Sequence, residues 1–438
     1  MKSFPAALRL LARMGVCLLL TPPAFLSAGS SGNNTFVIRK AHVFDGHQVL
    51  DQADVWVSDG MIKAVGKSLK VPSDVKVIDG SGDTVLPGFI DSHTHAWGDD
   101  LKKAEVFGVT TELDMFTEVK FLQQTKKNQA EGKDLDQADL RSAGIVATAA
   151  GGHGTEYGVQ IPTLSSPGEA QNWVDARVAE GSDYIKIIVD DRTEYGLHWP
   201  TLNIETVKAL VDAAHKRGKL AVVHIARQKD ARAVIAAGAD ALVHLFDDTA
   251  PEPDFASFVA AHHAFIIPTL DVKGNPSGDM LATDPFLAPY LMPKDIANLK
   301  QSFPIYPALN EKYAEETVAQ LRTAHVPILA GTDADNPTTA HGASIHRELE
   351  LLVHSGLTPQ EALAAATSVP AASFHLEDRG VIAPGKRADL LLVKGDPTRD
   401  IMRTRDIVSV WKLGVENDRA AYRSAVERAM AQAAVGGP

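Results

Sequence analysis

From Pro87 onward, short continuous apolar runs alternate with stretches of helical periodicity, and this alternation constrains the fold more than any other feature. Between the runs, segments such as Ile204–Lys216 and Lys229–Ala237 carry apolar residues at helical spacing. Strands that are apolar on both faces belong to parallel sheets covered by helices, so eight such units predict a (β/α)8 TIM barrel. The eight runs are Phe89–His95, Gly108–Met115, Ala143–Ala150, Tyr184–Asp190, Leu220–Ala226, Ala241–Phe246, Ala264–Leu270 and Val326–Asp333.

Before Pro87 the pattern is one of short β-strands. Val55–Ser58 and Met61–Val65 are two alternating runs, and Asp59-Gly60 stands between them. Asp-Gly at such a place predicts a tight hairpin, because both turn positions need a positive φ.

Turn and strand signals return near the C-terminus, at Gly380–Val393 and Val408–Leu413. We therefore expect a small β-sandwich formed from both chain ends, residues 29–86 and 376–438 with a tail, beside a barrel at residues 87–375. The stretch from Pro251 to Val318 is too long for one βα unit. It predicts an inserted loop or helices near the barrel mouth, with Asn275-Pro276-Ser277-Gly278 as the clearest loop.

The first 28 residues have the pattern of a secretory signal peptide. Three basic residues precede the apolar run Met14–Leu20, and Leu26-Ser27-Ala28 offers a small-residue cleavage site. The run is shorter than the ~20 residues that a membrane span needs. We therefore expect residues 1–28 to be removed, leaving a secreted or periplasmic protein without a stable membrane anchor. A disordered or membrane-anchored N-terminus is the alternative.

Composition argues against one class of partner. The net charge is −12, and no run rich in lysine or arginine occurs. Nucleic-acid binding needs a basic face, so we expect no nucleic-acid partner. Whether the chain forms a homo-oligomer stays open.

His93 and His95 stand two residues apart at the end of the first barrel run. Side chains alternate across a strand, so both imidazoles point the same way. At the C-terminal end of a barrel strand they would face the active-site mouth, where two imidazoles can hold one divalent ion. The alternative is two unrelated polar residues at a strand end.

Lys186 lies inside the fourth run, within Tyr184-Ile185-Lys186-Ile187-Ile188-Val189. An unpaired ammonium would be costly to bury there. Lys186 could form a salt bridge with an interior carboxylate, or its pKa could fall until the neutral amine reacts with CO₂. The resulting carbamate has two oxygens and can bridge two metal ions.

Three more candidate metal ligands lie at the ends of later apolar runs. His224 and His244 each follow an apolar triplet on adjacent strands, and Asp333 ends the eighth run. Asp335 competes with Asp333, which could instead cap the next helix. Nitrogen and oxygen donors without thiolate favour zinc, with manganese, cobalt or nickel as alternatives.

Together these residues resemble the pattern of a known protein family. Pro87-Gly88-Phe89-Ile90-Asp91-Ser92-His93-Thr94-His95 resembles the first-strand signature of the amidohydrolase superfamily. Lys186, His224, His244 and Gly331-Thr332-Asp333 follow in the order of that family. The loops Gly151-Gly152-His153-Gly154 and His341-Gly342 are similar to those of its imidazolonepropionase-related and prolidase-like subgroup.

The resemblance implies a binuclear centre with two divalent ions. His93, His95 and Asp333 would bind the buried ion, and His224 and His244 the outer one. Carboxylated Lys186 would bridge the ions together with hydroxide. Asp333 would accept the hydroxide proton and pass it to the leaving amine, as the catalytic residue.

Four residues are weaker candidates for substrate binding. His153 follows a Gly-Gly turn at the predicted mouth, and Tyr157 lies in the same loop. The alternative for His153 is an exposed loop histidine without a role in binding. Arg227 could pair with a substrate carboxylate or could be a solvated residue opening a helix. His341 follows the eighth strand.

We therefore expect a metal-dependent hydrolase that cleaves an amide or peptide bond in a small molecule, such as a dipeptide or an N-acyl amino acid. The same site acting on a lactone, carbamate or phosphoester stays open, because the ligand set does not distinguish these bonds. A non-catalytic binding scaffold would be expected to lack ligands, and all six are present.

Overall fold

The computed structural model describes residues 34–273, 277–302 and 309–435. The predicted signal peptide, residues 1–28, lies outside the described residues. None of the described helices is long and apolar enough to cross a membrane.

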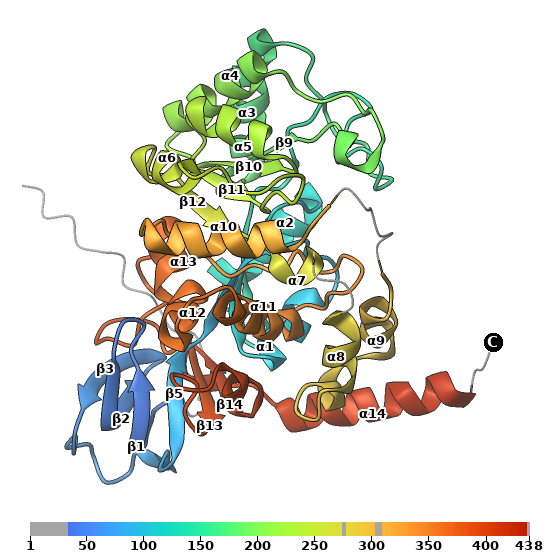
Figure 1. Cartoon of the computed structure of the whole chain (residues 1–438). Coiled ribbons are helices and arrows are strands. Elements are labelled where there is room, and N and C mark those ends of the chain that lie inside the picture. The colour runs from blue at the N-terminus through green and yellow to red at the C-terminus, as the bar shows by residue number, and fades with distance from the viewer. Residues whose placement is uncertain (1–33, 274–276, 303–308, 436–438) are drawn as a thin grey trace, which may run out of the picture. The chain divides into compact units, whose positions relative to one another are not determined.

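Strands from both ends of the chain pair into one β-sheet (Figure 1). The sheet order is β15-β14-β13-β5-β1-β2-β3, and β4 pairs with β1. The C-terminal strand β13 lies antiparallel to β5, with Leu390 opposite Pro87 and Lys394 opposite Asp83. These strands are β1 (Phe36–Phe44), β2 (Val49–Ser58), β3 (Met61–Gly66), β4 (Lys76–Asp79), β5 (Asp83–Pro87), β13 (Leu390–Lys394), β14 (Ile407–Lys412) and β15 (Val415–Glu416).

The predicted hairpin joins β2 to β3. Asp59 and Gly60 have φ values of 54° and 77°, and Ser58 pairs with Met61. A Cβ atom on Gly60 would lie only 2.7 Å from the carbonyl oxygen of Leu413. Both the turn and the close approach of the C-terminal segment therefore require glycine at this position.

The middle of the chain forms two parallel sheets, in the orders β6-β7-β8 and β12-β11-β10-β9. All residues of β6, β7 and β9 are buried, as expected for parallel strands covered on both faces. The strands are β6 (Phe89–Thr94), β7 (Val109–Asp114), β8 (Asp139–Ser142), β9 (Ile185–Val189), β10 (Ala221–Ile225), β11 (Ala241–Val243) and β12 (Phe265–Ile267). The predicted α/β class is confirmed, with an additional β-sheet that contains strands from both ends of the chain.

Helices alternate with these strands and cover them (Figure 1). Helix α4 has the predicted bounds, and its N-terminus is capped by Asn203, whose side chain accepts a hydrogen bond from the backbone N–H of Thr206. These helices are α1 (Asp100–Val106), α2 (Val119–Ala130), η1 (Pro167–Glu169), α3 (Ala170–Glu180), η2 (Thr193–Tyr195), α4 (Ile204–Lys216), α5 (Gln228–Ala236) and α6 (Phe255–Ala261).

Two predicted strands differ from the structure. The third is regular at β8 (Asp139–Ser142) and not at Ala143–Ala150, because Gly144 turns the chain with φ at 65°. Within the described residues, the eighth run, Val326–Asp333, makes one isolated β-bridge, between Ile328 and Ile266, and no regular strand. Pro327 lacks a backbone N–H, and a Cβ atom on Gly331 would lie 2.5 Å from Ile267, so neither residue suits a regular strand.

Backbone hydrogen bonds from these two segments connect the sheets. On one side, the N–H of Ala147 donates to the carbonyl of Lys186 on β9 over 2.8 Å. On the other, the N–H of Ser92 on β6 donates to Ala330 and the N–H of Leu329 donates to Ile266 on β12, each over 2.9 Å. Residues 326–333 are therefore hydrogen-bonded to both β6 and β12, and residues 143–150 to β9.

The remaining helices lie in the predicted insertion and near the C-terminus. Ser277 and Gly278 of the predicted loop begin helix α8, while residues 274–276 lie outside the described residues. Helix α14 was not predicted; Arg419 at its start packs over the ring of Tyr290, 4.1 Å from the ring centroid. These helices are α7 (Leu270–Lys273), α8 (Ser277–Thr283), η3 (Ala288–Tyr290), α9 (Pro293–Leu299), α10 (Lys312–Thr323), α11 (Ala343–His354), α12 (Pro359–Ala365), α13 (Ser368–Ser373), η4 (Ile401–Arg405) and α14 (Arg419–Val435).

Candidate metal centre

Five of the six predicted metal ligands lie at the carboxyl ends of the parallel strands or of the segment beside them, and Lys186 is the second residue of its strand. His93 lies on β6, Lys186 on β9 and His224 on β10. His95 and His244 follow the ends of β6 and β11 directly, and Asp333 ends the eighth run. Because parallel strands end at the same edge, these side chains meet there.

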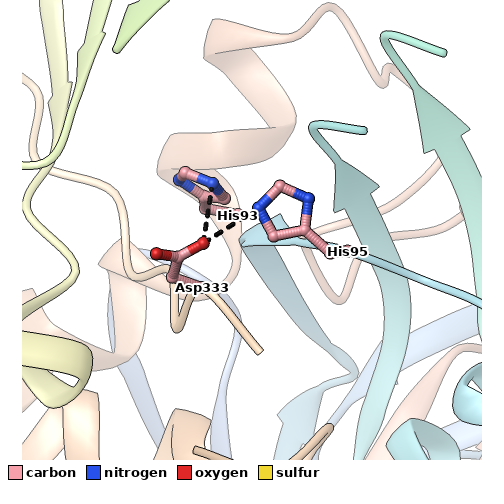
Figure 2. A group of neighbouring side chains, drawn as sticks. All are labelled: His93, His95 and Asp333. Atoms are coloured by element: carbon pink, nitrogen blue, oxygen red, sulfur yellow. Dashed lines mark ion pairs between the residues drawn. The ribbon is translucent and has the colours of Figure 1, made fainter. Parts of the chain in front are cut away.

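His93, His95 and Asp333 converge on one point (Figure 2). The Oδ1 atom of Asp333 lies 3.2 Å from Nε2 of His93 and 3.0 Å from Nε2 of His95. Both ring nitrogens of His93 and the Oδ1 atom of Asp333 are buried without a hydrogen-bond partner among the described residues. Donor atoms that converge without bonding one another fit a divalent cation between them.

His244 and His224 extend this cluster. The ring centroid of His244 lies 4.8 Å from that of His93 and 4.5 Å from that of His224. Its Nε2 atom is 3.9 Å from Oδ2 of Asp333, while Nδ1 is hydrogen-bonded to the hydroxyl of Thr269 over 2.7 Å. Such a bond fixes the ring and leaves Nε2 available to a metal ion.

Lys186 is buried between these groups, with 3% of its surface exposed. No carboxylate of the described residues lies within 4.0 Å of its Nζ atom, so the salt bridge considered from the sequence is not found there. Burial lowers the pKa of Lys186 to about 7, although Asp333 and Asp114 oppose the shift. A large fraction of the amine is therefore neutral near pH 7.

Three histidines of the cluster, His93, His224 and His244, are neutral as well. Burial lowers the pKa of His93 and of His224 to about 3, and it lowers the pKa of His244 well below the usual value. A neutral imidazole has a free lone pair on one nitrogen, which is the form that binds metal ions.

Asp333 and Asp335 occupy different environments. Asp333 has 11% of its side chain exposed and faces the histidines, whereas Asp335 is 39% exposed and lies 3.8 Å from Lys294. Asp333 does not cap a helix, because α11 starts at Ala343 after Gly342. Of these two carboxylates, only Asp333 lies among the candidate ligands.

His153 and Tyr157, predicted to bind substrate, lie at the edge of this cluster. The ring centroid of His153 is 4.9 Å from that of His224 and 6.1 Å from that of Tyr157. Its Nδ1 atom contacts Glu156 over 2.5 Å. Tyr157 is 55% exposed, so the two residues form one rim of the site.

Arg227 and His341 are engaged inside the protein. Arg227 contacts Asp191 and Asp230, each over 2.8 Å. His341 is buried, with Nδ1 2.8 Å from Glu112 and Nε2 3.5 Å from Asp100. Glu112 in turn accepts a hydrogen bond from the hydroxyl of Thr94, between His93 and His95, so His341 supports this motif from behind.

Two residues near the cluster were missed in the sequence analysis. Asp190 has Oδ2 3.4 Å from Nε2 of His224, and Arg192 has Nη2 2.7 Å from Nδ1 of His153. Asp190 ends the fourth apolar run, so its position after a strand was the signal that could have found it. His153, Asp190 and His224 also lie close enough together to hold a metal ion.

A model of the amidohydrolase family matches residues 84–416, which include all of these candidate ligands. The chain belongs to the amidohydrolase family. The predicted resemblance is thus confirmed, and with it the prediction of a hydrolase acting on carbon–nitrogen bonds. Enzymes of this family generally use metal ions.

Among curated relatives, this amidohydrolase is similar to an imidazolonepropionase of Deinococcus deserti. The two are 26% identical over 401 residues, which cover 83% of this chain and 92% of the relative. A dihydroorotase of Caldanaerobacter subterraneus is 40% identical over only 76 residues.

Solved structures share the fold of this amidohydrolase. A Xaa-Pro dipeptidase with bound methionine has a TM-score of 0.71 and 23% identity, covering 87% of this chain and 99% of its own. Phenylurea hydrolase B has a TM-score of 0.72 and 21% identity, covering 88% and 97%.

Proposed function

We propose that this amidohydrolase cleaves an amide or peptide bond of a small substrate, of the dipeptide or N-acyl amino acid type, at a binuclear metal centre. The observation that carries the proposal is the convergence of four histidines and Asp333 around a buried lysine without an ion-pair partner among the described residues. The structural similarity to a Xaa-Pro dipeptidase and to a phenylurea hydrolase supports a C–N bond as the target.

The fold that we propose for this centre is the eight-stranded barrel. The seven parallel strands would be completed by residues 326–334, which are hydrogen-bonded to both β6 and β12. The ligands would then surround the C-terminal mouth, where enzymes with this fold place their active sites.

Within this centre, His93, His95 and Asp333 would hold one ion, and His224 and His244 the other, with zinc as the proposed metal. The neutral amine of Lys186 would attack CO₂, forming one N–C bond and releasing one proton, and the resulting carbamate would give the centre an anionic oxygen ligand. When bound, the ions supply an activated water and polarise the scissile carbonyl.

Side chains of the protein would carry out proton transfer and substrate binding. Asp333 faces the histidine cluster and would accept the proton of the attacking water, then return it to the leaving nitrogen. His153, on the rim beside His224, would donate a hydrogen bond to the substrate carbonyl.

Metal content and three variants test this proposal. The purified protein should hold about two divalent ions per chain, as a two-metal hydrolase does. Lys186→Ala should lose bound metal and at least ~100-fold in turnover, the effect that even outer-shell partners of metal sites show. Asp333→Asn should lose ~10²–10⁴-fold, as expected for a general acid–base group, whereas the exposed Asp335→Asn should stay active.

The substrate class is tested with metal-loaded enzyme on a panel of dipeptides and N-acyl amino acids, beside lactones, carbamates and phosphoesters. Preferred turnover of one of the latter three would replace the proposed bond. An active enzyme without metal, or Lys186→Ala with unchanged metal content and turnover, would refute the binuclear centre.

A further inference from the structure

Three carboxylates gather in the loop that follows β9. One oxygen each of Asp190, Asp191 and Glu194 lies within 4.8 Å of the other two. The loop is held in this shape by its own backbone: the N–H of Arg192 donates to Asp190 over 2.7 Å, and the N–H of Thr193 donates to Asp191 over 3.0 Å. Like charges so close together repel unless a positive group compensates them.

Glu194 is the most unusual member of this cluster. Its side chain is 1% exposed, and neither carboxylate oxygen has a hydrogen-bond partner among the described residues. The nearest cationic atom of an ion pair is Nε of Arg227, at 3.9 Å. A buried, ionised carboxylate without donors is strongly unfavourable, so Glu194 must bind either a proton or a cation at this position.

The neighbouring cations do not balance the cluster. Arg227 is shared between Asp191 and Asp230, each at 2.8 Å, and Arg192 lies 3.2 Å from Asp190. Glu156 also lies 3.9 Å from Arg192, so five carboxylates face these two guanidinium groups, and full ionisation would leave an excess of three negative charges. Lys273, the next cation, is paired with Asp247 at 3.1 Å.

We propose that Asp190, Asp191 and Glu194 bind a hard divalent cation of the calcium type, at a site that adjoins the metal centre described above through the contact of Asp190 with His224. All three side chains offer oxygen donors, which calcium prefers, and no histidine nitrogen is needed. Calcium takes about 6–8 oxygens in a flexible geometry, so carbonyls of the loop and water can complete its shell.

A cation bound to this loop would also fix the side of the metal centre on which His153 lies. Arg192 of this loop contacts His153, and its guanidinium lies 5.6 Å from the ring centroid of Trp199. Asp190 also contacts His224. A cation that holds the loop would therefore hold Arg192 and Trp199 against the side of the site on which His153 lies. This site does not depend on the proposed function.

Calcium binding to the full-length protein, with the metals that it carries on purification, tests the proposal. Titration calorimetry with CaCl₂ should show one saturable site, and calcium should raise the Tm. Glu194→Gln keeps the shape but removes the charge, so it should weaken calcium binding by roughly tenfold or more and abolish the Tm shift. Asp212→Asn, which removes a carboxylate that is 63% exposed on α4, is the matched control and should bind like the wild type.

Terbium luminescence gives a second readout. Tb³⁺ in this site should be sensitised by Trp199, whose backbone N–H donates to the backbone carbonyl of Asp191 over 2.9 Å. Trp199→Phe should lower the luminescence while calcium still binds. If Glu194→Gln fails to fold, Asp191→Asn replaces it.

Two outcomes would overturn the site. In one, CaCl₂ neither binds to the wild type in calorimetry nor raises its Tm. In the other, Glu194→Gln and Asp212→Asn bind calcium equally well. Binding of Mg²⁺ in place of Ca²⁺ would overturn the assignment to calcium.

Discussion

Three residues of the candidate centre have an unusual backbone. His244, Thr269 and Asp333 have φ values of 67°, 50° and 59°, in the left-handed region. Such a conformation costs ~1–2 kcal/mol for a residue with a side chain, and glycine would avoid most of that cost. The side chains of all three residues face the histidine cluster or orient it. The strained backbone therefore lowers stability at positions where these side chains are required for the centre.

The buried ion pair behind the His93-Thr94-His95 motif gives a prediction about stability. Burial alone would lower the pKa of His341, but Glu112 and Asp100 raise it to about 10. His341→Gln leaves Glu112 buried without its cation, so we expect the free energy of unfolding at pH 6 to fall by ~3–5 kcal/mol. Urea denaturation measures this change.

The pH dependence of this effect has a definite sign. The folded-state pKa of His341 lies above the usual histidine value of about 6.5, so its stabilisation is complete below about pH 6.5. It is lost as the pH rises through about 10. The difference between wild type and variant should therefore shrink between pH 6 and pH 10, while the exposed His47→Gln shows no such trend. A constant difference would contradict the charged state of His341.

At the scale of single elements, the β2–β3 hairpin allows a test of close packing. Gly60 and Gly82 both have positive φ, at 77° and 84°. A Cβ atom would meet the Leu413 carbonyl at Gly60 but nothing within 4 Å at Gly82. Gly82→Ala should cost ~1–2 kcal/mol from conformation alone, and Gly60→Ala should cost more. Equal losses in urea denaturation would show that the contact with Leu413 is unimportant.

Elements with strong local signals were predictable from the sequence. Helix α4 has amphipathic periodicity and an Asn203 cap, and the hairpin has Asp-Gly at its turn. Strand β8 has the sequence Asp-Leu-Arg-Ser. It was not predicted, because three of its four residues are polar and the prediction relied on apolar runs. Helix α14 is rich in alanine and largely exposed, so no apolar face marked it.

The candidate site was predictable to a similar extent. The positions of the six ligands followed from strand ends and family order, because strand direction determines where each side chain points. The roles of Arg227 and His341 did not follow, because their partners come from distant parts of the fold. Glu112, for example, is 229 residues from His341 in the sequence.

At the scale of the whole molecule, one carboxylate connects the central and C-terminal segments. Asp139 on β8 lies 2.8 Å from Arg379, 2.8 Å from Arg387 and 2.7 Å from Lys412 on β14. Asp139→Asn would leave three largely buried cations without their shared anion, so we expect a loss of ~3–5 kcal/mol in the free energy of unfolding.

The pH dependence again checks the cause. Burial alone would raise the pKa of Asp139, but the three cations hold this pKa well below its usual range. Its stabilisation is thus present above about pH 4 and is lost as the pH falls further. Urea denaturation at pH 7 should separate Asp139→Asn from the control Asp136→Asn, whose carboxylate is 65% exposed. Similar stabilities of the two variants would contradict the role of this cluster.

The pairing of β13 with β5 has a consequence for biosynthesis. During translation, β5 leaves the ribosome long before β13, its neighbour in the sheet. The nascent chain therefore carries an open strand edge while the whole α/β part is being made. Completion of the sheet must wait for the last segment of the chain, so a ribosome that stalls after residue 380 would release a product with an unprotected edge, prone to aggregation.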